Sequence, residues 1–107
     1  MASPAISGGK VVTGSQDHTV YCFDAAKGTI LWKYKSQGKA DASPVIAGNK
    51  VIIATSDGRL HILDLGSGKE TWSYEIGSPI TATPAVIDNM IIVASEDGKL
   101  YAFGPGK

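Results

Sequence analysis

Three aspartates recur at a fixed spacing and are the first candidates for chemistry. Asp17, Asp57 and Asp97 lie 40 residues apart, so a folded repeat would place them in a ring of carboxylates, which can bind a cation. However, Asp57 and Asp97 are each followed by Gly, and Asp-Gly between two strands is a hairpin signal that accounts for both. The alternating Asp and Asn of a calcium-binding loop are missing. We therefore interpret all three as turn residues and predict no metal site.

The two histidines and the single cysteine are the remaining candidates for a metal ligand, a base or a nucleophile. His18 replaces a turn glycine, whereas His61 replaces the strand tyrosine seen at Tyr21 and Tyr101, so the histidines share no repeat position. Cys22 stands alone, which excludes an internal disulfide and a zinc site made of several thiolates. A lone Cys on a strand usually acts as a small buried apolar residue. We predict no catalytic, cofactor-binding or metal-binding residue, no cofactor and no enzyme activity.

The overall charge argues against two broad classes of partner. Among 107 residues, 10 Lys and Arg balance 10 Asp and Glu. This balance disfavours the basic stripe of a nucleic-acid binder and the polybasic patch of a membrane-surface protein. No apolar run approaches the roughly 20 residues of a membrane span. We expect one domain, no nucleic-acid partner and no membrane insertion.

The elements that must position these residues follow from a repeat of 40 residues along the whole chain. Besides the aspartates, a proline keeps this spacing in three copies, at Pro4, Pro44 and Pro84. Four further pairs do the same: Asp24 with Asp64, Gly28 with Gly68, Trp32 with Trp72, and Tyr34 with Tyr74. A shared register without insertions indicates one structural unit copied along the chain. We therefore divide residues 1–107 into units of about 3–42, 43–82 and 83–107, the last of which ends before a Trp.

Each unit is expected to consist of short strands and tight turns. In the second unit we expect strands over 44–48, 50–56, 59–65 and 70–76, with a two-residue type I′ turn before 59–65. The second of these strands is a nearly continuous β-branched run, which is typical of burial on both faces. Four antiparallel strands about every 40 residues are typical of a β-propeller blade. The chain is therefore predicted to be all-β, with about 2.75 blades and a ring completed by other chains.

The tryptophans fall on the outermost strand, where no further strand covers them. We expect each indole to lie over the flank of the next blade and to bury about 150–250 Å² there. The aspartates of the preceding turn would cap it through their carboxylates, and the glycines would supply its left-handed residue. Six residues form this predicted structural latch between blades: Asp24, Gly28, Trp32, Asp64, Gly68 and Trp72.

These residues resemble the tryptophan-docking motif of the PQQ-like repeat, found in quinoprotein dehydrogenases and in BamB-type outer-membrane assembly lipoproteins. The family pattern reads approximately A-x-D-x-x-T/S-G-K-x-x-W. The second unit matches it at Asp64, Ser67, Gly68, Lys69 and Trp72. The resemblance implies a β-propeller and an extracytoplasmic location, either periplasmic or at the cell surface. The quinone, calcium ion, catalytic Asp and vicinal Cys pair of the dehydrogenases are not carried over to this chain.

Three other interpretations stay open at this point. Residues 14–28 have the S-x-D-x-T-V rhythm of a WD-type repeat, although its Gly-His opening is missing and the Trp lies on a different strand. The chain is alternatively a fragment of a PQQ-dependent dehydrogenase propeller. The third alternative is a glycan- or peptide-binding surface made by the tyrosines: Tyr21, Tyr34, Tyr74 and Tyr101.

The number of blades predicts self-association. Propellers close with about 4 to 8 or more blades, so about 2.75 blades leave two apolar faces open. Head-to-tail contacts between copies produce closed rings when the rotation fits. We expect a homo-oligomer, either a dimer or a trimer, that closes a propeller and acts as a non-catalytic scaffold for assembly or for a protein partner.

Overall fold

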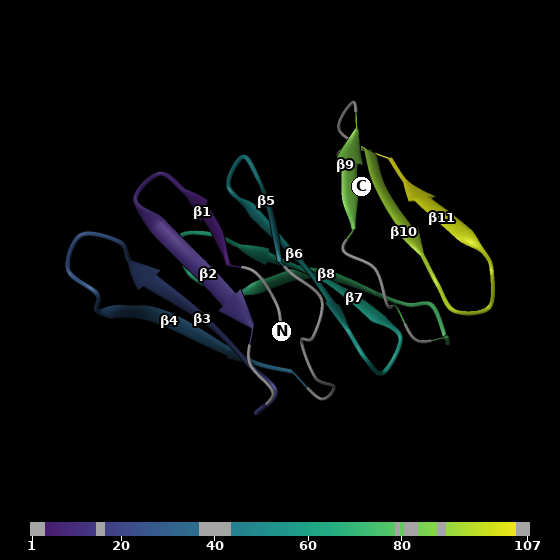
Figure 1. The fold of residues 1–107 in the computed structure, drawn as a ribbon, viewed down its shortest axis with the longest axis horizontal. Helices are drawn as coiled ribbons and strands as arrows, with labels where there is room; N and C mark the ends of the chain where they lie inside the picture. The colour runs from purple at the N-terminus through teal and green to yellow at the C-terminus, as the bar shows by residue number, and fades with distance from the viewer. Residues whose placement is uncertain are drawn as a thin grey trace.

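The chain folds into three antiparallel sheets that follow one another along the long axis of the molecule (Figure 1). The computed structural model describes residues 4–14, 17–36, 44–78, 80, 84–87 and 90–104. The described residues contain strands and turns without a helix, which confirms the all-β prediction. Within the same ranges, no helix is present that could cross a bilayer.

Each sheet is a meander in which neighbours in sequence are neighbours in space. Unit 1 consists of β1 (Ala5–Ser7), β2 (Lys10–Gly14), β3 (Thr19–Asp24) and β4 (Ile30–Lys35). Unit 2 consists of β5 (Val45–Ala47), β6 (Lys50–Thr55), β7 (Arg59–Asp64) and β8 (Glu70–Glu75). Unit 3 consists of β9 (Ala85–Ile87), β10 (Met90–Ala94) and β11 (Leu100–Phe103). The strands therefore run from the first to the last in the order expected of propeller blades.

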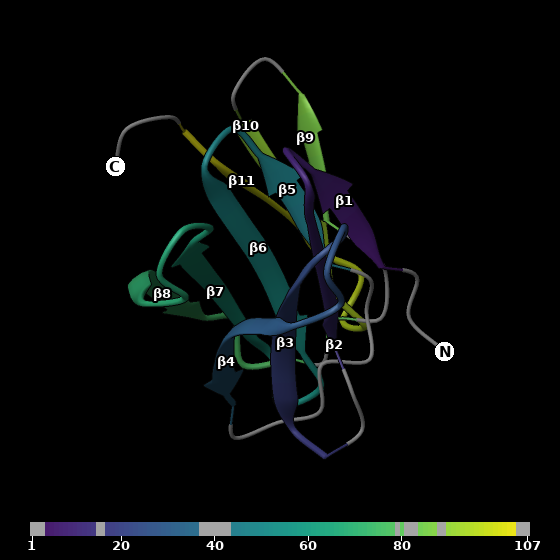
Figure 2. The ribbon, with the colours of Figure 1, turned by 90° about the vertical axis from the view of Figure 1, so that its left-hand side faces the viewer.

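Unit 2 is buried on both faces because the other two sheets cover it (Figures 1 and 2). Successive side chains of a strand point to opposite faces, so β6 contributes to two separate cores. Val51 and Ile53 belong to the cluster shared with unit 1, and Ile52 and Ala54 belong to the cluster shared with unit 3. Each of these four residues is at most 1% exposed. The prediction of a doubly buried second strand is thus confirmed for β6, whereas β2 and β10 are buried mainly on one face.

A β-bulge recurs at the same place in units 1 and 2. Cys22 pairs with Trp32, but the next residue, Phe23, pairs with Ile30, so Leu31 is an extra residue in β4. The register shifts in the same way after Ile62 in unit 2. A bulge bends its strand and redirects the neighbouring side chains. In both units it lies directly before the tryptophan.

The hairpin turn between β6 and β7 differs from the two-residue type I′ turn suggested by the sequence. Thr55 pairs with Arg59, so residues 56–58 form a three-residue loop, and the amide of Gly58 donates to the carbonyl oxygen of Thr55 at 3.1 Å. Only Gly58 in this loop has a positive φ, +81°. The geometry is that of a hairpin in which a left-handed glycine completes the loop. Asp57 instead contributes its carboxylate, which accepts a hydrogen bond from the Thr55 hydroxyl.

Candidate functional site

The contact between units 1 and 2 is centred on Trp32, which β4 carries over the edge of unit 2. Its side chain is only 8% exposed, and its indole Nε1 donates a hydrogen bond to the carbonyl oxygen of Leu65 at 2.7 Å. A Cβ atom at Gly68 would lie 2.5 Å from Cδ2 and Cε3 of the same ring. The indole therefore lies flat against the backbone of Gly68, and no larger residue fits there.

The turn that presents Gly68 is held by Asp64. The carboxylate Oδ2 of Asp64 accepts hydrogen bonds from the amide and the hydroxyl of Ser67, both at 2.9 Å. The amide of Gly68, with φ of +76°, donates to the carbonyl oxygen of Asp64 at 2.7 Å. An aspartate that accepts from its own turn fixes the loop without help from the rest of the fold.

The equivalent turn of unit 1 is built in the same way around Asp24. Its carboxylate Oδ1 accepts from the amides of Ala26 and Lys27, at 2.9 and 3.0 Å. The amide of Gly28 donates to the carbonyl oxygen of Asp24 at 2.7 Å. Nothing lies within 4 Å of a Cβ atom placed on Gly28. The two turns thus share one geometry, but only the one in unit 2 receives an indole from a described residue.

Trp72, the counterpart of Trp32, is half-buried at the contact between units 2 and 3. Its ring meets that of Phe103 edge-on, with centroids 5.3 Å apart, and stacks with that of Tyr74 at 6.0 Å. The position equivalent to Leu65 is Pro105, which lies outside the described residues, and the position equivalent to Gly68 would be 108. Of the six predicted latch residues, Trp32, Asp64 and Gly68 thus meet at the contact between units 1 and 2, and Trp72 lies at the contact between units 2 and 3. Asp24 and Gly28 form a turn of unit 1 that no described indole contacts.

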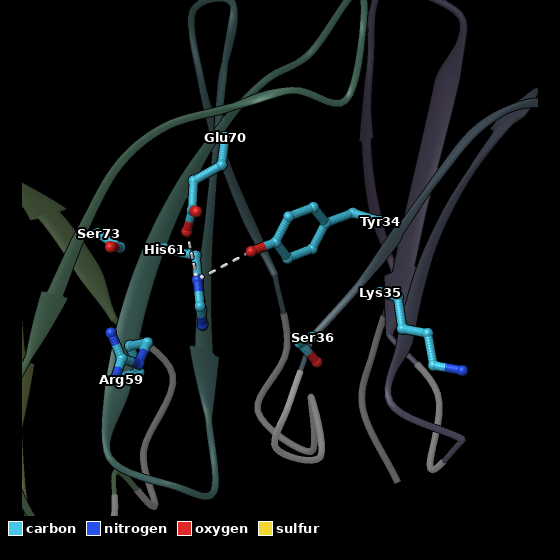
Figure 3. A pocket seen from close by; sticks show the side chains of 7 residues that line it. All are labelled: Tyr34, Lys35, Ser36, Arg59, His61, Glu70 and Ser73. Carbon is cyan, nitrogen blue, oxygen red and sulfur yellow. Dashed lines mark hydrogen bonds and ion pairs between the residues drawn. The ribbon is translucent and has the colours of Figure 1, made fainter.

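A polar pocket of about 280 Å³ opens between units 1 and 2 (Figure 3). Nδ1 of His61 lies 2.6 Å from Oε2 of Glu70 and 3.3 Å from the hydroxyl of Tyr34, which reaches across from unit 1. Nε2 of His61 lies 3.4 Å from Oγ1 of Thr55. Seven residues line the pocket: Tyr34, Lys35, Ser36, Arg59, His61, Glu70 and Ser73.

The order of groups in this pocket, carboxylate, imidazole and hydroxyl, invites comparison with a catalytic triad. Thr55 is 0% exposed and its hydroxyl donates to Asp57, so the hydroxyl does not face a substrate. Burial, together with the negative charge of Glu70 and a hydrogen bond to it, raises the pKa of Tyr34 to about 12. The phenol is therefore protonated at neutral pH. The arrangement can bind polar groups and join the two units, but it presents no activated nucleophile.

The sequence led us to consider His61 as a metal ligand or base and to set it aside, and its partner Glu70 was missed. Both residues depart from the repeat, because unit 1 has Tyr21 and Ile30 at the equivalent positions. Two departures from a 40-residue repeat that lie nine residues apart were the available signal. The bulge shifts the pairing of β7 with β8 by one residue. A regular antiparallel register would therefore not have predicted that His61 and Glu70 lie close together.

The three recurring aspartates each bond within their own turn. Oδ1 of Asp17 accepts from the amide of Thr19 at 3.0 Å, and Oδ1 of Asp97 accepts from the hydroxyl of Ser95. The bond from Ser95 is the main reason why the pKa of Asp97 is lowered. Among the described residues, no three His, Cys, Asp or Glu side chains are grouped so that they could hold a metal ion. Cys22 is fully buried in the core between units 1 and 2, and this burial raises the pKa of its thiol.

The outward face of unit 3 is apolar and lies at one end of the stack of sheets (Figure 1). By strand alternation it carries Ile92, Ala94, Leu100 and Ala102, and Leu100 is 72% exposed. The residues 40 positions earlier lie in the core between units 2 and 3: Ile52, Ala54, Leu60 and Ile62. The outward face of unit 3 thus has the composition of a buried blade face.

The outward face of unit 1 has the complementary composition. It carries Val11, Thr13, Tyr21 and Phe23, and the two aromatic rings stack with their centroids 6.0 Å apart. The equivalent residues of unit 3 are Ile91, Val93, Tyr101 and Phe103. All four pack against unit 2. The outward face of unit 1 therefore resembles the face of unit 3 that packs against unit 2. It is the kind of surface that the outward face of unit 3 would need as a partner.

Stacked antiparallel sheets, each formed by one copy of a 40-residue repeat, define a β-propeller repeat protein. The sequence model of a family described as outer membrane protein assembly factor BamB matches residues 1–105. The chain belongs to this family of PQQ-like repeat proteins. No curated protein sequence matched the chain.

Solved structures share the fold over nearly the whole chain. BamB from Moraxella catarrhalis is 32% identical, with a TM-score of 0.83 over 95% of this chain and 32% of that one. The quinohemoprotein alcohol dehydrogenase ADHIIG from Pseudomonas putida HK5 is 24% identical, with a TM-score of 0.88 over 99% of this chain and 19% of that one. The computationally designed Ika8 protein is 22% identical, with a TM-score of 0.83 over 94% and 32%. The last two show the fold alone, and this chain spans less than a third of each protein.

Proposed function

We propose that the chain is a non-catalytic propeller module that assembles head to tail with further copies of itself and serves as an interaction scaffold. One observation carries this proposal: the two outward faces repeat the residues that are buried between neighbouring units. A second copy that places its unit 1 on unit 3 of the first would reproduce the contact between units 2 and 3. Repeated contacts of this kind close a ring, most simply as a dimer.

The composition of the faces supports a head-to-tail contact over a symmetric one. Unit 3 offers small and branched side chains, including Ala94 and Ala102, as unit 2 does at its contact with unit 3. Unit 1 offers the large rings of Tyr21 and Phe23. Large side chains against small ones fill space at protein density, whereas two aromatic faces or two small-residue faces do not.

We propose a non-catalytic role because the residues with reactive side chains make structural contacts. Asp17, Asp57 and Asp97 bond within turns, Cys22 fills a core, and Thr55 has no exposed surface. Each of these residues has a structural role that accounts for its position. A scaffold needs no further chemistry from them.

An extracytoplasmic location is part of the same proposal. The family description refers to an outer membrane assembly factor, and the Moraxella structure is a BamB protein. We expect the chain in the periplasm or at the cell surface. Cell fractionation with an antibody against the native protein would test this, and recovery in the cytoplasmic fraction alone would contradict it.

Mass measurement in solution tests the assembly. The unsubstituted chain should scatter light as a closed oligomer at micromolar concentration. Leu100→Glu places an unpaired charge in the contact and should weaken association by about 100-fold or more. Leu100 is exposed within one chain, so this variant should still fold. A mass of one chain for the unsubstituted protein throughout would contradict the proposal.

Lys99→Glu is the matched control for that variant. It places the same carboxylate one residue away, at an exposed position directly before β11. It should leave the oligomer mass unchanged. If Lys99→Glu dissociates the oligomer as strongly as Leu100→Glu, general charge rather than the face of unit 3 controls association.

A further inference from the structure

The polar pocket between units 1 and 2 has no role in the assembly proposed above (Figure 3). It lies within a single chain, whereas head-to-tail docking would use the outward faces of units 1 and 3. The pocket therefore needs an explanation of its own.

The repeat shows which residues open this pocket. Ser36 and His61 line it, and both are buried, at 4% and 5% exposed. The residues 40 positions later are Ile76 and Tyr101, which pack against the core between units 2 and 3. Ser is smaller than Ile and His is smaller than Tyr, so space that the larger side chains would fill stays open. Burying polar groups in place of apolar ones is also unfavourable. The pocket is thus a departure from the packing that the repeat would give.

The charged groups of the pocket are mostly paired within the chain. Nδ1 of His61 lies 2.6 Å from Oε2 of Glu70, and Nη2 of Arg59 lies 3.2 Å from Oε1 of Glu75. Lys35 also lines the pocket, but its ammonium group points away from His61 (Figure 3). An ionic ligand would have to compete with these internal pairs. We therefore expect the pocket to select a ligand without net charge.

Hydrogen-bonding capacity remains at the same groups. A guanidinium carries five N–H donors, and a carboxylate can accept about four hydrogen bonds. The contact of Arg59 with Glu75 involves one nitrogen, and that of Glu70 with His61 involves one oxygen. The hydroxyl of Ser73 can both donate and accept. Donors and acceptors placed around one pocket match a ligand whose own groups do both, as hydroxyl groups do.

The volume of the pocket and the ring of Tyr34 narrow the ligand further. About 280 Å³ is just below the range of about 300–1,000 Å³ that is typical of sites for drug-sized ligands, so the pocket suits a molecule of one ring. Tyr34 reaches in from unit 1 (Figure 3), and its aromatic ring offers apolar surface beside the polar hydroxyl. The C–H groups on one face of a sugar ring pack well against such a surface.

We propose that this pocket binds a single neutral polyhydroxylated ring, such as a monosaccharide unit or a cyclic polyol. Arg59, Glu70 and Ser73 are the hydrogen-bonding residues, and Tyr34 packs against the ring. His61 is a positioning residue, because its Nδ1 holds the carboxylate of Glu70. The ligand thus contacts both units of the same chain.

Titration of the isotope-labelled protein, followed by NMR, tests the proposal with four probes: glucose, galactose, N-acetylglucosamine and myo-inositol. At least one of them should shift the backbone amide signals of residues 59–61 and 70–73 in a saturable way. A Kd of about 1–10 mM is expected for a ligand of this size.

Two variants of the pocket should weaken this binding at least about tenfold. Ser73→Leu narrows the pocket from an exposed position in β8, so it should still fold. Arg59→Met keeps an aliphatic stem but removes the N–H donors. Lys33→Leu is the matched control for Ser73→Leu, because it places the same side chain at the equivalent exposed position of β4, outside the pocket. It should leave the Kd unchanged.

Phosphate and glycine serve as charged probes. Tighter binding of either than of every neutral probe would overturn the proposal, because the pocket would then recognise charge. No saturable shift with any neutral probe up to about 100 mM, shifts confined to residues outside the pocket, or equal Kd values for Ser73→Leu and Lys33→Leu would also overturn it. The oligomer mass does not affect this outcome, so the site and the assembly stand or fall separately.

Discussion

Gly28 and Gly68 occupy equivalent positions with nearly the same backbone, yet their surroundings differ. Their φ angles are +73° and +76°, and the amide of each donates to the carbonyl oxygen of an aspartate at 2.7 Å. A Cβ atom on Gly28 would meet nothing within 4 Å, whereas one on Gly68 would collide with the ring of Trp32. Both turns therefore need a residue that tolerates a positive φ. Only the turn of Gly68 also needs a residue without a side chain, because the indole of Trp32 packs against it.

Alanine at these two glycines should therefore have unequal effects. Gly28→Ala should cost about 1 kcal/mol of unfolding free energy, the usual cost of a left-handed residue with a side chain. Gly68→Ala should cost about 3 kcal/mol or more, because the strain is the same and the indole is also displaced. Urea denaturation followed by tryptophan fluorescence measures both. Similar losses would show that Trp32 does not stabilise the contact between units.

His18 takes the place of the turn glycine and is the only described non-glycine residue with a positive φ, +70°. The equivalent residues are Gly58 and Gly98. His18→Gly should stabilise the fold by about 0.5–1 kcal/mol, because strain is relieved and the bonds from Ser36 to the carbonyl oxygen of residue 18 are kept. Thermal denaturation measures the gain.

Gly98→Ala is the reverse experiment for His18→Gly. It introduces a side chain at φ of +83° with nothing within 4 Å, so it should cost about 1 kcal/mol. A loss of stability in His18→Gly would show that the imidazole makes contacts that outweigh the strain.

At the residue scale, the sequence predicted which residues are equivalent in successive repeats. It predicted less well which side chains touch each other. The turn roles of Asp24 and Asp64 follow from local chemistry that does not depend on the rest of the fold. The bond from Trp32 to Leu65 joins residues 33 apart, and the contact of His61 with Glu70 depends on a bulge. Contacts of both kinds depend on how two sheets or two strands are placed in space, and the periodicity of the sequence alone does not set this placement.

At the scale of elements, the strands were predictable and their irregularities were not. The expected strands of unit 2 differ from β5–β8 by at most one residue at each end. The bulges opposite Cys22 and Ile62 could not be predicted from the apolar pattern. Their extra residues, Leu31 and Thr71, are also compatible with a regular outer strand. The turn before β7 contains the expected Gly58, but one residue more than Asp-Gly suggests.

The contact of Tyr34 in β4 with His61 in β7 should make the stability of the fold depend on pH in the alkaline range. The pKa of Tyr34 is raised from its ordinary value of 10.0 to about 12, chiefly by burial and then by Glu70. A raised pKa favours the folded state fully below pH 10, and this contribution is lost as the pH rises toward 12. The free energy of unfolding should therefore fall between these two pH values. Denaturant titrations at a series of pH values would measure the decline.

Tyr34→Phe isolates the contribution of that phenol. Tyr21 and Cys22 also have raised pKa values and titrate in the alkaline range, so the unsubstituted protein alone is not decisive. The variant should show a shallower decline than the unsubstituted chain. Identical pH profiles would mean that Tyr34 titrates alike in the folded and unfolded states.

At the scale of the whole molecule, the order of the sheets follows from the repeat. Unit 2 is covered on both faces, and the cores on its two sides are separate. The sequence predicted this stacking because β6 is apolar at consecutive positions rather than at alternate ones. It did not distinguish the two outward faces. The structure shows that unit 1 ends in aromatic side chains, whereas unit 3 ends in small and branched ones.

The central claim is that these two outward faces fit each other, and mixing two blocked variants tests it most directly. Leu100→Glu blocks unit 3 and leaves the face of unit 1 intact, while Phe23→Glu does the opposite. Light scattering should give the mass of one chain for each variant alone. An equimolar mixture should give a pair of chains that grows no further, because only one functional contact remains. A mixture that stays monomeric, or a Phe23→Glu variant that pairs with itself, would contradict head-to-tail assembly.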